Sequence, residues 1–249
     1  MKQKKVAIVI GASGGIGRFV ALELDKEGFI VVLVAHNLER LKKVSKGLSK
    51  KAYLVSTDIS KEKEVISLIK DTTRKFKHID LLVNCAGTLL FNKCEEMSST
   101  DFNKLVATDF TGAFFCIRES IKQMKKQKQG GQIINISSLA AKIPSFLPGR
   151  SVYCAVKAAV GIMLESIQAE LSRSGKKIKI ATIYPGLVAT DSIIKRGTRN
   201  LKELKKFALK PEDIVYAVLS IVNQGENSNI TEIIIRPLFN TALIERPRS

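Results

Sequence analysis

Short apolar runs rich in β-branched residues alternate with helical patterns along all 249 residues of the chain. The runs predict strands at Val6–Ile10, Ile30–Val34, Tyr53–Ser56, Leu81–Asn84, Ile133–Ser137, Ile178–Ile183 and Ile230–Ile235. Between them, helices are predicted near residues 16–27, 38–48, 61–76, 99–126, 151–173 and 212–223. The strand runs lack polar alternation, which is typical of parallel strands covered on both faces. We therefore expect an α/β fold, with a doubly wound, seven-stranded parallel sheet and helices on both faces.

One long irregular stretch, Pro185–Lys210, follows the sixth predicted strand, and no linker or internal repeat divides the chain. The length fits one large domain spanning residues 1–249. Ligands of open α/β sheets bind beyond the carboxyl ends of the strands. We therefore expect the insertion near residues 187–210 to cover a substrate as a lid.

The formal charge of +18 comes mainly from lysine, and the lysine clusters fall at predicted helix ends and loops. Few aromatic residues lie between them for base stacking, which favours solvated surfaces over a specific nucleic-acid site. No apolar run reaches the roughly 18 residues of a membrane span, and the first apolar segment is too short for a signal-peptide core. The four cysteines show neither CxxC pairing nor histidine-linked metal spacing. We expect reduced thiols, no metal site and a cytoplasmic location.

A glycine-rich turn follows the first predicted strand and opens the first helix, in the order Gly11-Ala-Ser13-Gly-Gly15-Ile16-Gly17. Glycines here permit a tight turn, close approach of the backbone to a pyrophosphate, and close packing of the helix on the strand. The helix N-terminus adds free N–H groups and a positive dipole for phosphates. At the first βα turn of such a sheet, this pattern predicts a dinucleotide site.

Tyr153 and Lys157 stand one helical turn apart, which places their Cβ atoms roughly 5–6 Å from each other on one helix face. A free phenol has a pKa of about 10, and a nearby ammonium lowers that pKa by roughly 1–3 units. A phenol tuned in this way can donate a proton to a carbonyl oxygen as hydride reaches the carbon, and accept it in reverse. Alone, however, a Tyr and a Lys at this spacing are usually only neighbours on a helix.

Five motifs occur in order along the chain. They are GxxxGxG at 11–17, Asn84-Cys85-Ala86-Gly87, Asn135-Ile-Ser-Ser138, YxxxK at 153–157 and Pro185-Gly186-Leu-Val188-Ala-Thr190. Together they resemble the short-chain dehydrogenase/reductase family, over essentially the whole chain. The resemblance implies a Rossmann-type fold and an NAD(P)-dependent oxidoreductase.

The resemblance also implies roles for individual residues. Tyr153 is expected to be the general acid/base, and Lys157 to lower its pKa and hold the nicotinamide ribose. Ser138, rather than the adjacent Ser137, is expected to form a hydrogen bond with the substrate oxygen. Beyond the glycine turn, the expected cofactor contacts are His36, Asn37, Asp58 (adenine ring), Ile59, Asn84, Ala86, Gly87, Pro185, Gly186, and, at the carboxamide, Val188 and Thr190.

Three positions depart from the family pattern. Ile10 replaces a threonine that braces the turn, and Cys85 replaces the second asparagine of an Asn-Asn-Ala-Gly element. Asp109 replaces an asparagine that supports a helix distortion, whose backbone carbonyl holds a water on the active-site lysine. A carboxylate near Lys157 is expected to neutralise its ammonium in part. We therefore count Asp109 among the catalytic residues and expect reduced but real activity.

No carboxylate stands at Ala35, where NAD-preferring members accept the adenosine ribose hydroxyls. NADP-preferring members usually place an arginine where His36 stands, and a neutral imidazole is a poorer phosphate partner. Arg40, Lys42 and Lys43 follow closely and can assist. We expect NADP(H) to be favoured over NAD(H).

These observations predict reversible interconversion of a small-molecule carbonyl and a secondary alcohol. The basic residues of 195–210, with Lys125, Lys126, Lys128 and Arg173, favour a 3-oxoacyl thioester on an acidic carrier protein or coenzyme A. The alternatives are a short-chain hydroxy-acid or amino-acid dehydrogenase and, from another class, a weakly catalytic cofactor-binding sensor or scaffold. By family resemblance, a homodimer or homotetramer is expected through the helices at 99–126 and 151–173.

Overall fold

A computed structural model describes residues 3–49, 52–143, 149–191 and 206–238 of the chain. Its sheet has seven strands in the order β3-β2-β1-β4-β5-β6-β7, and every neighbouring pair is parallel. The strands are β1 (Val6–Ile10), β2 (Ile30–Ala35), β3 (Tyr53–Ser56), β4 (Leu81–Asn84), β5 (Gly131–Ile136), β6 (Ile178–Pro185) and β7 (Glu232–Ile235). The predicted strands are confirmed, with boundaries that differ by two residues at most.

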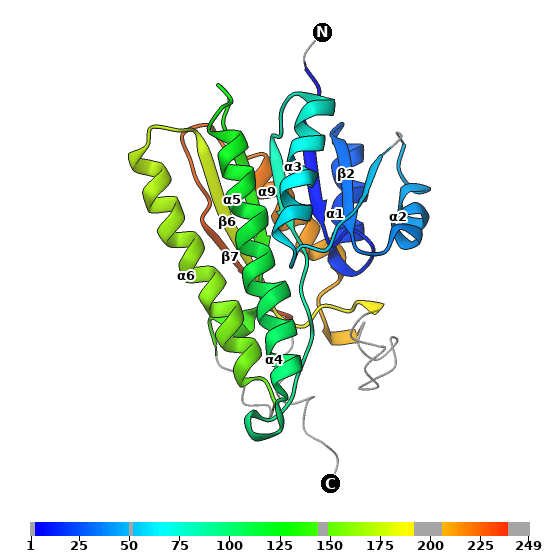
Figure 1. The fold of residues 1–249 in the computed structure, drawn as a ribbon, viewed down its shortest axis with the longest axis vertical. Coiled ribbons are helices and arrows are strands. Elements are labelled where there is room, and N and C mark those ends of the chain that lie inside the picture. Colours follow the sequence, from blue (N-terminus) through cyan, green and yellow to red (C-terminus); the bar gives the residue numbers. More distant parts are fainter. Residues whose placement is uncertain (1–2, 50–51, 144–148, 192–205, 239–249) are drawn as a thin grey trace.

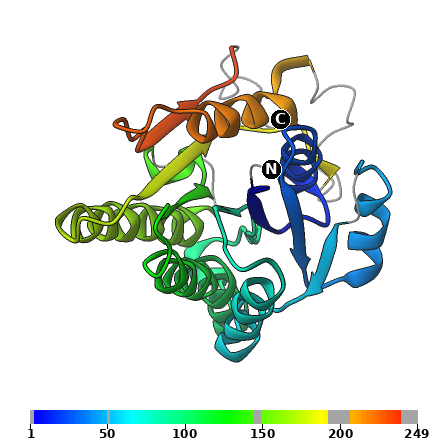
Figure 2. The same ribbon diagram turned by 90° about the horizontal axis from the view of Figure 1, so that it is seen from above.

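Helices cover both faces of the sheet, as the sequence predicts (Figures 1 and 2). They are α1 (Gly15–Lys26), α2 (Leu38–Ser45), α3 (Glu62–Phe76), α4 (Ser99–Leu105), α5 (Ala113–Met124), α6 (Ser151–Arg173) and α9 (Pro211–Val222). Buried side chains of α1, α2 and α9 form one core cluster with the sheet, and those of α3, α5 and α6 form another on the opposite face. The interior strand β1 is buried along its whole length, because both clusters include side chains from it.

The helical stretch predicted near residues 99–126 is present, and it carries a distortion at Asp109, the position where the family resemblance implies one. A π-helical segment, Val106–Gly112, separates α4 from α5. Two tertiary contacts accompany the distortion. The Asp109 carboxylate accepts a hydrogen bond from the Thr88 backbone N–H at 2.7 Å. Ile59 packs so closely on Gly112 that a Cβ on this glycine would lie only 2.8 Å from Ile59 Cγ1. π-Helical bulges of this kind are frequent at functional sites.

Helix α6 is long and apolar enough, by length and composition alone, to cross a membrane. Its apolar residues Val160 and Leu164 are nevertheless buried in the core cluster beside the sheet. The helix also carries Lys157, which is buried and ion-paired. We interpret α6 as a core helix of the fold.

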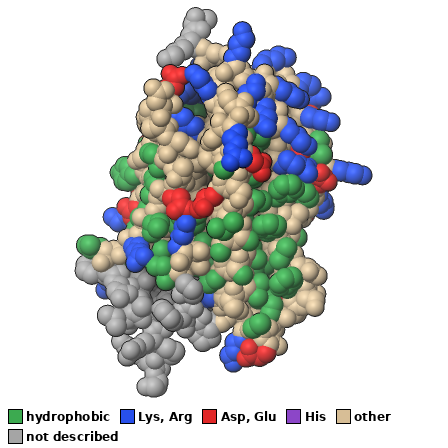
Figure 3. All heavy atoms as spheres, turned by 90° about the vertical axis from the view of Figure 1, so that its left-hand side faces the viewer, with side chains coloured by type: hydrophobic (Ala, Val, Ile, Leu, Met, Phe, Trp, Pro, Cys, Tyr) green, Lys and Arg blue, Asp and Glu red, His purple; other side chains and the backbone are tan. Residues whose placement is uncertain are grey.

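Basic side chains gather at the edge of the sheet where the strands begin. Lys125, Lys126 and Lys128 lie between the end of α5 and the start of β5, and Arg173 ends α6 shortly before β6 starts. Figure 3 shows lysine and arginine side chains gathered towards the top of the molecule, at this edge. The carboxyl ends of the strands lie at the opposite edge.

Candidate functional site

The residues predicted to bind a cofactor meet at one edge of the sheet. Apart from Tyr153 and Lys157 on α6, all of them lie at the carboxyl end of a strand or in the segment that follows it, which for Gly15, Ile16 and Gly17 is the first turn of α1. Because the strands are parallel, these ends share one edge. Helix α6 starts at the same edge and brings Tyr153 and Lys157 to it in its first two turns (Figure 1).

The glycine turn is as crowded as its predicted role requires. Gly11 has a φ of 76°, and a Cβ there would lie 2.9 Å from the backbone of residues 85 and 86. A Cβ on Gly17 would lie 2.5 Å from the Gly11 carbonyl oxygen. Both contacts are with backbone atoms, which cannot rotate away as a side chain can. Only glycine therefore fits at these two positions without moving the turn.

The first turn of α1 is open on the side where a dinucleotide phosphate would bind. A Cβ on Gly14 or Gly15 would meet nothing within 4 Å. The helix has no side-chain cap and no acidic residue in its first turn. Free N–H groups at a positive helix end, beside open space, fit the pyrophosphate of NAD(P).

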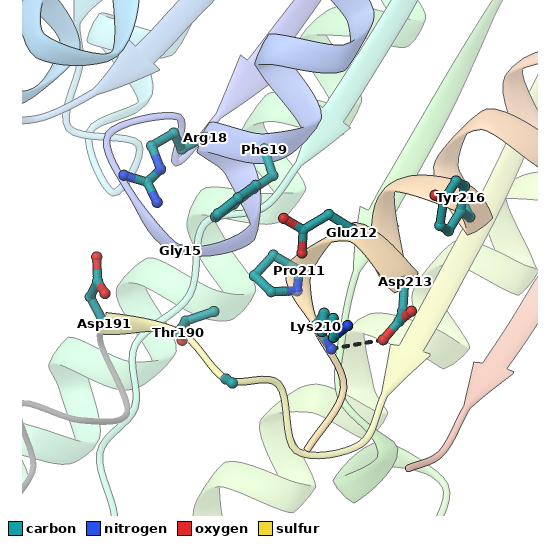
Figure 4. A pocket seen from close by; sticks show the side chains of 11 residues that line it. Gly15, Arg18, Phe19, Thr190, Asp191, Lys210, Pro211, Glu212, Asp213 and Tyr216 are labelled. Carbon is teal, nitrogen blue, oxygen red and sulfur yellow. Dashed lines mark hydrogen bonds between the residues drawn. The ribbon is translucent and has the colours of Figure 1, made fainter. Parts of the chain in front are cut away.

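A cleft of about 550 Å³ lies beside this turn, between α1 and the start of α9 (Figure 4). Arg18 and Asp191 point toward one another across it, and the Lys210 N–H donates to the Asp213 carboxylate at 2.7 Å. Gly15 and Thr190 are the only predicted cofactor residues among the described residues that line it. Tyr153, Lys157 and Ser138 are not among them, so this cleft borders the expected cofactor position and does not include the catalytic residues.

Two buried asparagines connect the ends of β4 and β5. The Asn84 side-chain Nδ2 donates to Asn135 Oδ1 at 2.9 Å, and both residues are almost completely buried. Asn84 Oδ1 also accepts a hydrogen bond from the Ala86 N–H at 3.3 Å. The pair therefore fixes the loop after β4, which carries Gly87, against the strand that leads to Ser138.

The Asp109 carboxylate and the Lys157 ammonium form a buried ion pair. Their Oδ2 and Nζ atoms lie 2.8 Å apart, with side chains 0% and 8% exposed. A Cβ on Gly87 would lie 3.0 Å from Nζ and 3.3 Å from Oδ2, so Gly87 leaves room for the pair. The predicted contact between the carboxylate and the lysine is therefore present, and it joins α6, the π-helical segment and the loop after β4.

The pKa of Lys157 is raised above its ordinary value of 10.5. Burial is the largest single influence and lowers it, but the charge of Asp109, with Tyr153 and the hydrogen bond to Asp109, outweighs burial. Lys157 is therefore an ammonium at neutral pH. Its Nζ lies 5.7 Å from the centre of the Tyr153 ring, so the two predicted catalytic groups are neighbours.

Tyr153 is buried in a small apolar cluster with Leu105 and Val156. The ring of Phe91 meets it edge-on, with ring centres 5.2 Å apart and an interplanar angle of 84°. Ala140 packs against the same cluster, and its N–H donates to Ser138 Oγ at 3.2 Å. The turn that carries Ser138 is thus linked to the cluster that holds the phenol.

Ser137 and Ser138 differ in their surroundings. Ser137 is buried, and its Oγ has no hydrogen-bond partner among the described residues. Ser138 is half-buried and caps the short 3₁₀ turn Leu139–Ala141 with its Oγ. Partial exposure beside the Tyr153 cluster agrees with the choice of Ser138 as the residue that reaches a substrate, which stays a prediction.

The residues after β2 and β3 have structural partners of their own. Asn37 caps α2 by accepting a hydrogen bond from the Arg40 N–H at 2.9 Å. Asp58 accepts hydrogen bonds from Ser60 Oγ and N–H, and the Ser60 hydroxyl is the main reason that its pKa is lowered. His36 is exposed beside them. An ionised Asp58 and an exposed imidazole are therefore available at the expected adenosine end.

Most of the predicted lid, residues 192–205, lies outside the described residues. The two flanks of the predicted lid pair with each other. Val188 forms a parallel bridge with Leu209, and the N–H of Ala189 donates to the Leu209 carbonyl at 2.8 Å. Val188 and Thr190 are both buried, and Gly186 packs against Pro237.

One argument for an acidic carrier protein is wrong. Lys125, Lys126, Lys128 and Arg173 lie at the edge of the sheet opposite to Tyr153 (Figure 1). Tyr153 and Arg173 are separated by about 30 Å along α6, at a rise of 1.5 Å per residue. A carrier bound at those residues does not face the site. The positions of these basic residues in the sequence did not show this, because the two ends of one helix lie at opposite edges of the sheet.

Several residues of the site were not foreseen from the sequence. Phe91 packs on Tyr153, the Arg150 guanidinium lies over Phe91, and Arg18 lines the cleft. Phe91 belongs to no predicted motif. Arg150 did carry a signal, since it is a basic residue directly before the helix that holds Tyr153.

Comparisons with known proteins agree with this geometry. The model of the short chain dehydrogenase family matches residues 5–200. An uncharacterized oxidoreductase of Staphylococcus saprophyticus is 33% identical over 238 residues, which cover 94% of this chain and 96% of the relative. Two solved structures share the fold with TM-scores of 0.83.

One of these structures is the closed form of a serine dehydrogenase complexed with NADP⁺, which is 26% identical and covers 92% of this chain and 94% of its own. The other is ElxO with NADP bound, which is 27% identical and covers 94% of this chain and 97% of its own. The family model and the Staphylococcus relative each span most of the chain. The chain belongs to the short-chain dehydrogenase/reductase family and is an NAD(P)-dependent oxidoreductase with that family's Rossmann-like fold.

Proposed function

We propose that this protein uses NADP(H) to interconvert a small-molecule carbonyl and a secondary alcohol. The observation that supports this most directly is the position of Tyr153 and Lys157. Both are buried on one face of α6, at the edge of the sheet that carries the open glycine turn. A phenol and a charged ammonium beside a dinucleotide site are the groups that proton transfer to a carbonyl oxygen needs.

When bound, the cofactor supplies or accepts the hydride at the reacting carbon. In reduction, Tyr153 donates its phenolic proton to the carbonyl oxygen, and in oxidation it accepts the proton back. The Lys157 ammonium stabilises negative charge on the phenol oxygen, and Asp109 at 2.8 Å moderates that effect. Because Ser138 Oγ accepts from the Ala140 N–H, its own proton remains available for the substrate oxygen.

A preference for NADP(H) over NAD(H) is part of the proposal. The solved relatives with NADP support it, as do the absence of a carboxylate at Ala35 and the exposed His36 and Arg40 at the end of β2 and the start of α2. A carboxylate in that place would repel a 2′-phosphate. Comparing kcat/KM for the two cofactors tests this, and a clear preference for NAD(H) would contradict it.

A 3-oxoacyl thioester remains a candidate substrate. Among the described residues that supported it, Lys206 and Lys210 lie on the side of the site, and Lys210 lines the cleft. A hydroxy acid or amino acid is a second candidate. The similarity to a serine dehydrogenase supports it, because that relative's name gives an amino acid as its substrate. Assays with both classes distinguish the two candidates.

A lid formed by residues 187–210, a cytoplasmic location and a homodimer or homotetramer also remain proposals. The exposed side chains of Phe102 on α4 and Ile162 on α6 support an oligomer through these helices. Figure 3 shows apolar side chains on the surface of this side of the molecule. Light scattering combined with size-exclusion chromatography measures the oligomeric state directly.

The central test is NADPH oxidation against a panel of ketones, oxo acids and thioesters. We expect the Tyr153→Phe variant to lose about 10²- to 10⁴-fold in kcat, the usual range for a general acid/base. Tyr53→Phe is the matched control, because this tyrosine packs on Phe76 from β3 and lies outside the predicted site. Tight NADP binding without reduction of any carbonyl would favour a cofactor-binding sensor.

A further inference from the structure

A network of four polar side chains lies at the end of the 3₁₀ turn Leu139–Ala141. Lys142 directly follows this turn. Its Nζ donates to Glu232 Oε1 on β7 at 2.5 Å and lies 3.6 Å from Glu165 Oε1 on α6. The Tyr184 hydroxyl on β6 donates to the same Glu232 oxygen at 3.1 Å, and the Lys142 ammonium lies 4.7 Å from the centre of the tyrosine ring. The side chain of Lys142 therefore connects the turn to three other elements.

The contacts within this network determine its charges. The pKa of Lys142 is raised above its ordinary value of 10.5, mainly because the ammonium donates to the Glu232 carboxylate. Burial raises the pKa of Glu232, but its hydrogen bonds, with that from Lys142 the largest, outweigh burial and lower the pKa below 4.5. Lys142 and Glu232 are therefore a cation and an anion at neutral pH. Burial also raises the pKa of Tyr184, so its hydroxyl keeps the proton that it donates.

The exposed and the buried parts of the network have different roles. Tyr184 is almost completely buried, and a Cβ on Gly161 of α6 would lie 2.8 Å from its hydroxyl oxygen. The phenol is thus confined between α6 and β7. The side chains of Lys142 and Glu232 are each 30% exposed, and an ion pair with such access to water contributes little to stability. Its main consequence is the place in which it holds the turn.

The other end of the same turn carries Ser138. Its Oγ accepts a hydrogen bond from the Ala140 N–H at 3.2 Å, and its carbonyl accepts one from the Ala141 N–H at 3.0 Å. The Lys142 N–H donates in turn to the Leu139 carbonyl at 3.0 Å. Hydrogen bonds between residues so close in sequence make 138–142 one compact unit. A displacement of Lys142 therefore also displaces the Ser138 hydroxyl.

We propose that Lys142 is a positioning residue, which holds the Ser138 hydroxyl in place for the substrate oxygen by binding Glu232 and Tyr184. This inference rests on the proposed function and extends it to a residue outside the predicted site. Loss of the ammonium releases the end of the turn, and a displacement of about 1 Å at a reacting group costs up to about 10²-fold in rate. The loss should appear in kcat, because a hydrogen bond to the reacting oxygen strengthens in the transition state.

The test is a double-mutant cycle on kcat, with NADPH and the carbonyl that is reduced fastest among the ketones, oxo acids and thioesters. Ser138→Ala alone should lose about 10²- to 10³-fold, the effect of removing one donor to the substrate oxygen. Lys142→Met alone should lose about 10- to 100-fold. In the Ser138→Ala background, Lys142→Met should cost less than about twofold, because the hydroxyl that it positions is already absent.

Two further variants separate positioning from a general effect on the structure. Lys142→Arg keeps the cation and should retain most of kcat. Lys26→Met is the matched control, because Lys26 forms an exposed ion pair with Glu23 at 2.8 Å on α1, and it should leave kcat unchanged. The Kd of NADPH, measured by the fluorescence of the cofactor, should be the same in Lys142→Met and the wild type.

Losses that multiply in the double variant overturn the inference, as does an unchanged kcat or a weakened Kd of NADPH in Lys142→Met. A loss in Lys142→Arg as large as that in Lys142→Met overturns it too. Each of these results leaves the proposed function standing. If Lys142→Met does not fold, Glu232→Gln passes through the same cycle, since it removes the charge that Lys142 binds. A wild-type protein that reduces no carbonyl overturns the proposed function and the inference with it.

Discussion

Two buried polar pairs stabilise the carboxyl edge of the sheet, and they differ in charge. Asn84 and Asn135 join β4 to β5 through a neutral hydrogen bond of 2.9 Å. Asp109 and Lys157 join the π-helical segment to α6 through an ion pair of 2.8 Å. The neutral pair fixes loops and has no proton to exchange at ordinary pH. The charged pair lies beside Tyr153, so the same contact that holds the structure also sets the electrostatics of the proposed reaction.

Removing one member of the charged pair should have the largest effect on stability. Lys157→Met leaves the Asp109 carboxylate buried without its counter-charge, which costs about 3–5 kcal/mol. Urea unfolding measures the loss, and activity should fall with it. The control is Lys177→Met, because Lys177 forms an exposed pair with Glu226, and such pairs contribute about 0–1 kcal/mol. Equal losses of stability in the two variants would contradict the difference expected between the buried and the exposed ion pair.

Removing one member of the neutral pair should have a smaller effect. Asn135→Ala leaves the Asn84 amide without its acceptor, which costs about 1–3 kcal/mol. A double-mutant cycle with Asn84→Ala should give a coupling energy of about 0.5–3 kcal/mol. Both variants should leave the pH–rate profile of the remaining activity in place. A shift of that profile would show that the neutral pair also takes part in proton transfer.

Neutralising only the carboxylate of the charged pair should change the electrostatics at Tyr153, because the Lys157 ammonium then lacks its counter-charge. Asp109→Asn keeps an oxygen for the Thr88 N–H and frees the Lys157 charge to act on Tyr153. We expect a higher kcat for alcohol oxidation and a rate profile displaced by about one unit to lower pH, since a neighbouring charge moves titrations by roughly 1–3 units. An unchanged turnover and profile would show that the carboxylate has no influence on the phenol.

The smallest effect should appear in alkaline solution. The pKa of Lys157 in the native state is raised above 10.5, the ordinary value for the unfolded chain. The native state therefore binds the ammonium proton of Lys157 more tightly than the unfolded chain does. The contribution of this proton to stability is complete below the ordinary pKa and is lost as the pH rises through the native pKa. The free energy of unfolding should therefore fall more steeply above about pH 10.5 in the wild type than in Lys157→Met. Parallel curves would contradict the raised pKa.

The sequence predicted the fold well because its signals are local. Continuous apolar runs such as Val6–Ile10 are long enough to define a strand and its burial without knowledge of partners. The glycine turn was equally readable, because positions such as Gly11 demand a conformation that other residues rarely adopt. These features place the expected cofactor edge without any information about tertiary contacts.

The features that local patterns did not predict depend on distant residues. The helix distortion at Asp109 was expected from the family resemblance alone, and the π-helical segment coincides with contacts from Thr88 and Ile59, which stand 21 and more residues earlier in the chain than the residues they meet. The row formed by Arg150, Phe91 and Tyr153 needs the loop after β4 to lie against the start of α6. A local hydrophobic periodicity carries no information about such tertiary contacts. For Lys125 and Arg173 the prediction placed basic residues near the site that lie far from it. Their positive charge is evident in the sequence, but the direction of their helices, which places them at the opposite edge of the sheet, is not.

The separation between the basic edge and the candidate site has a practical consequence. The protein carries much of its positive charge, including Lys125, Lys126 and Lys128, at the edge where the strands begin (Figure 3). A negatively charged resin or electrode should therefore attract this edge first, once the protein is within the distance over which dissolved salt does not screen the charges. Molecules immobilised in this way would be oriented alike, with the cleft beside α1 directed away from the support and towards the solution.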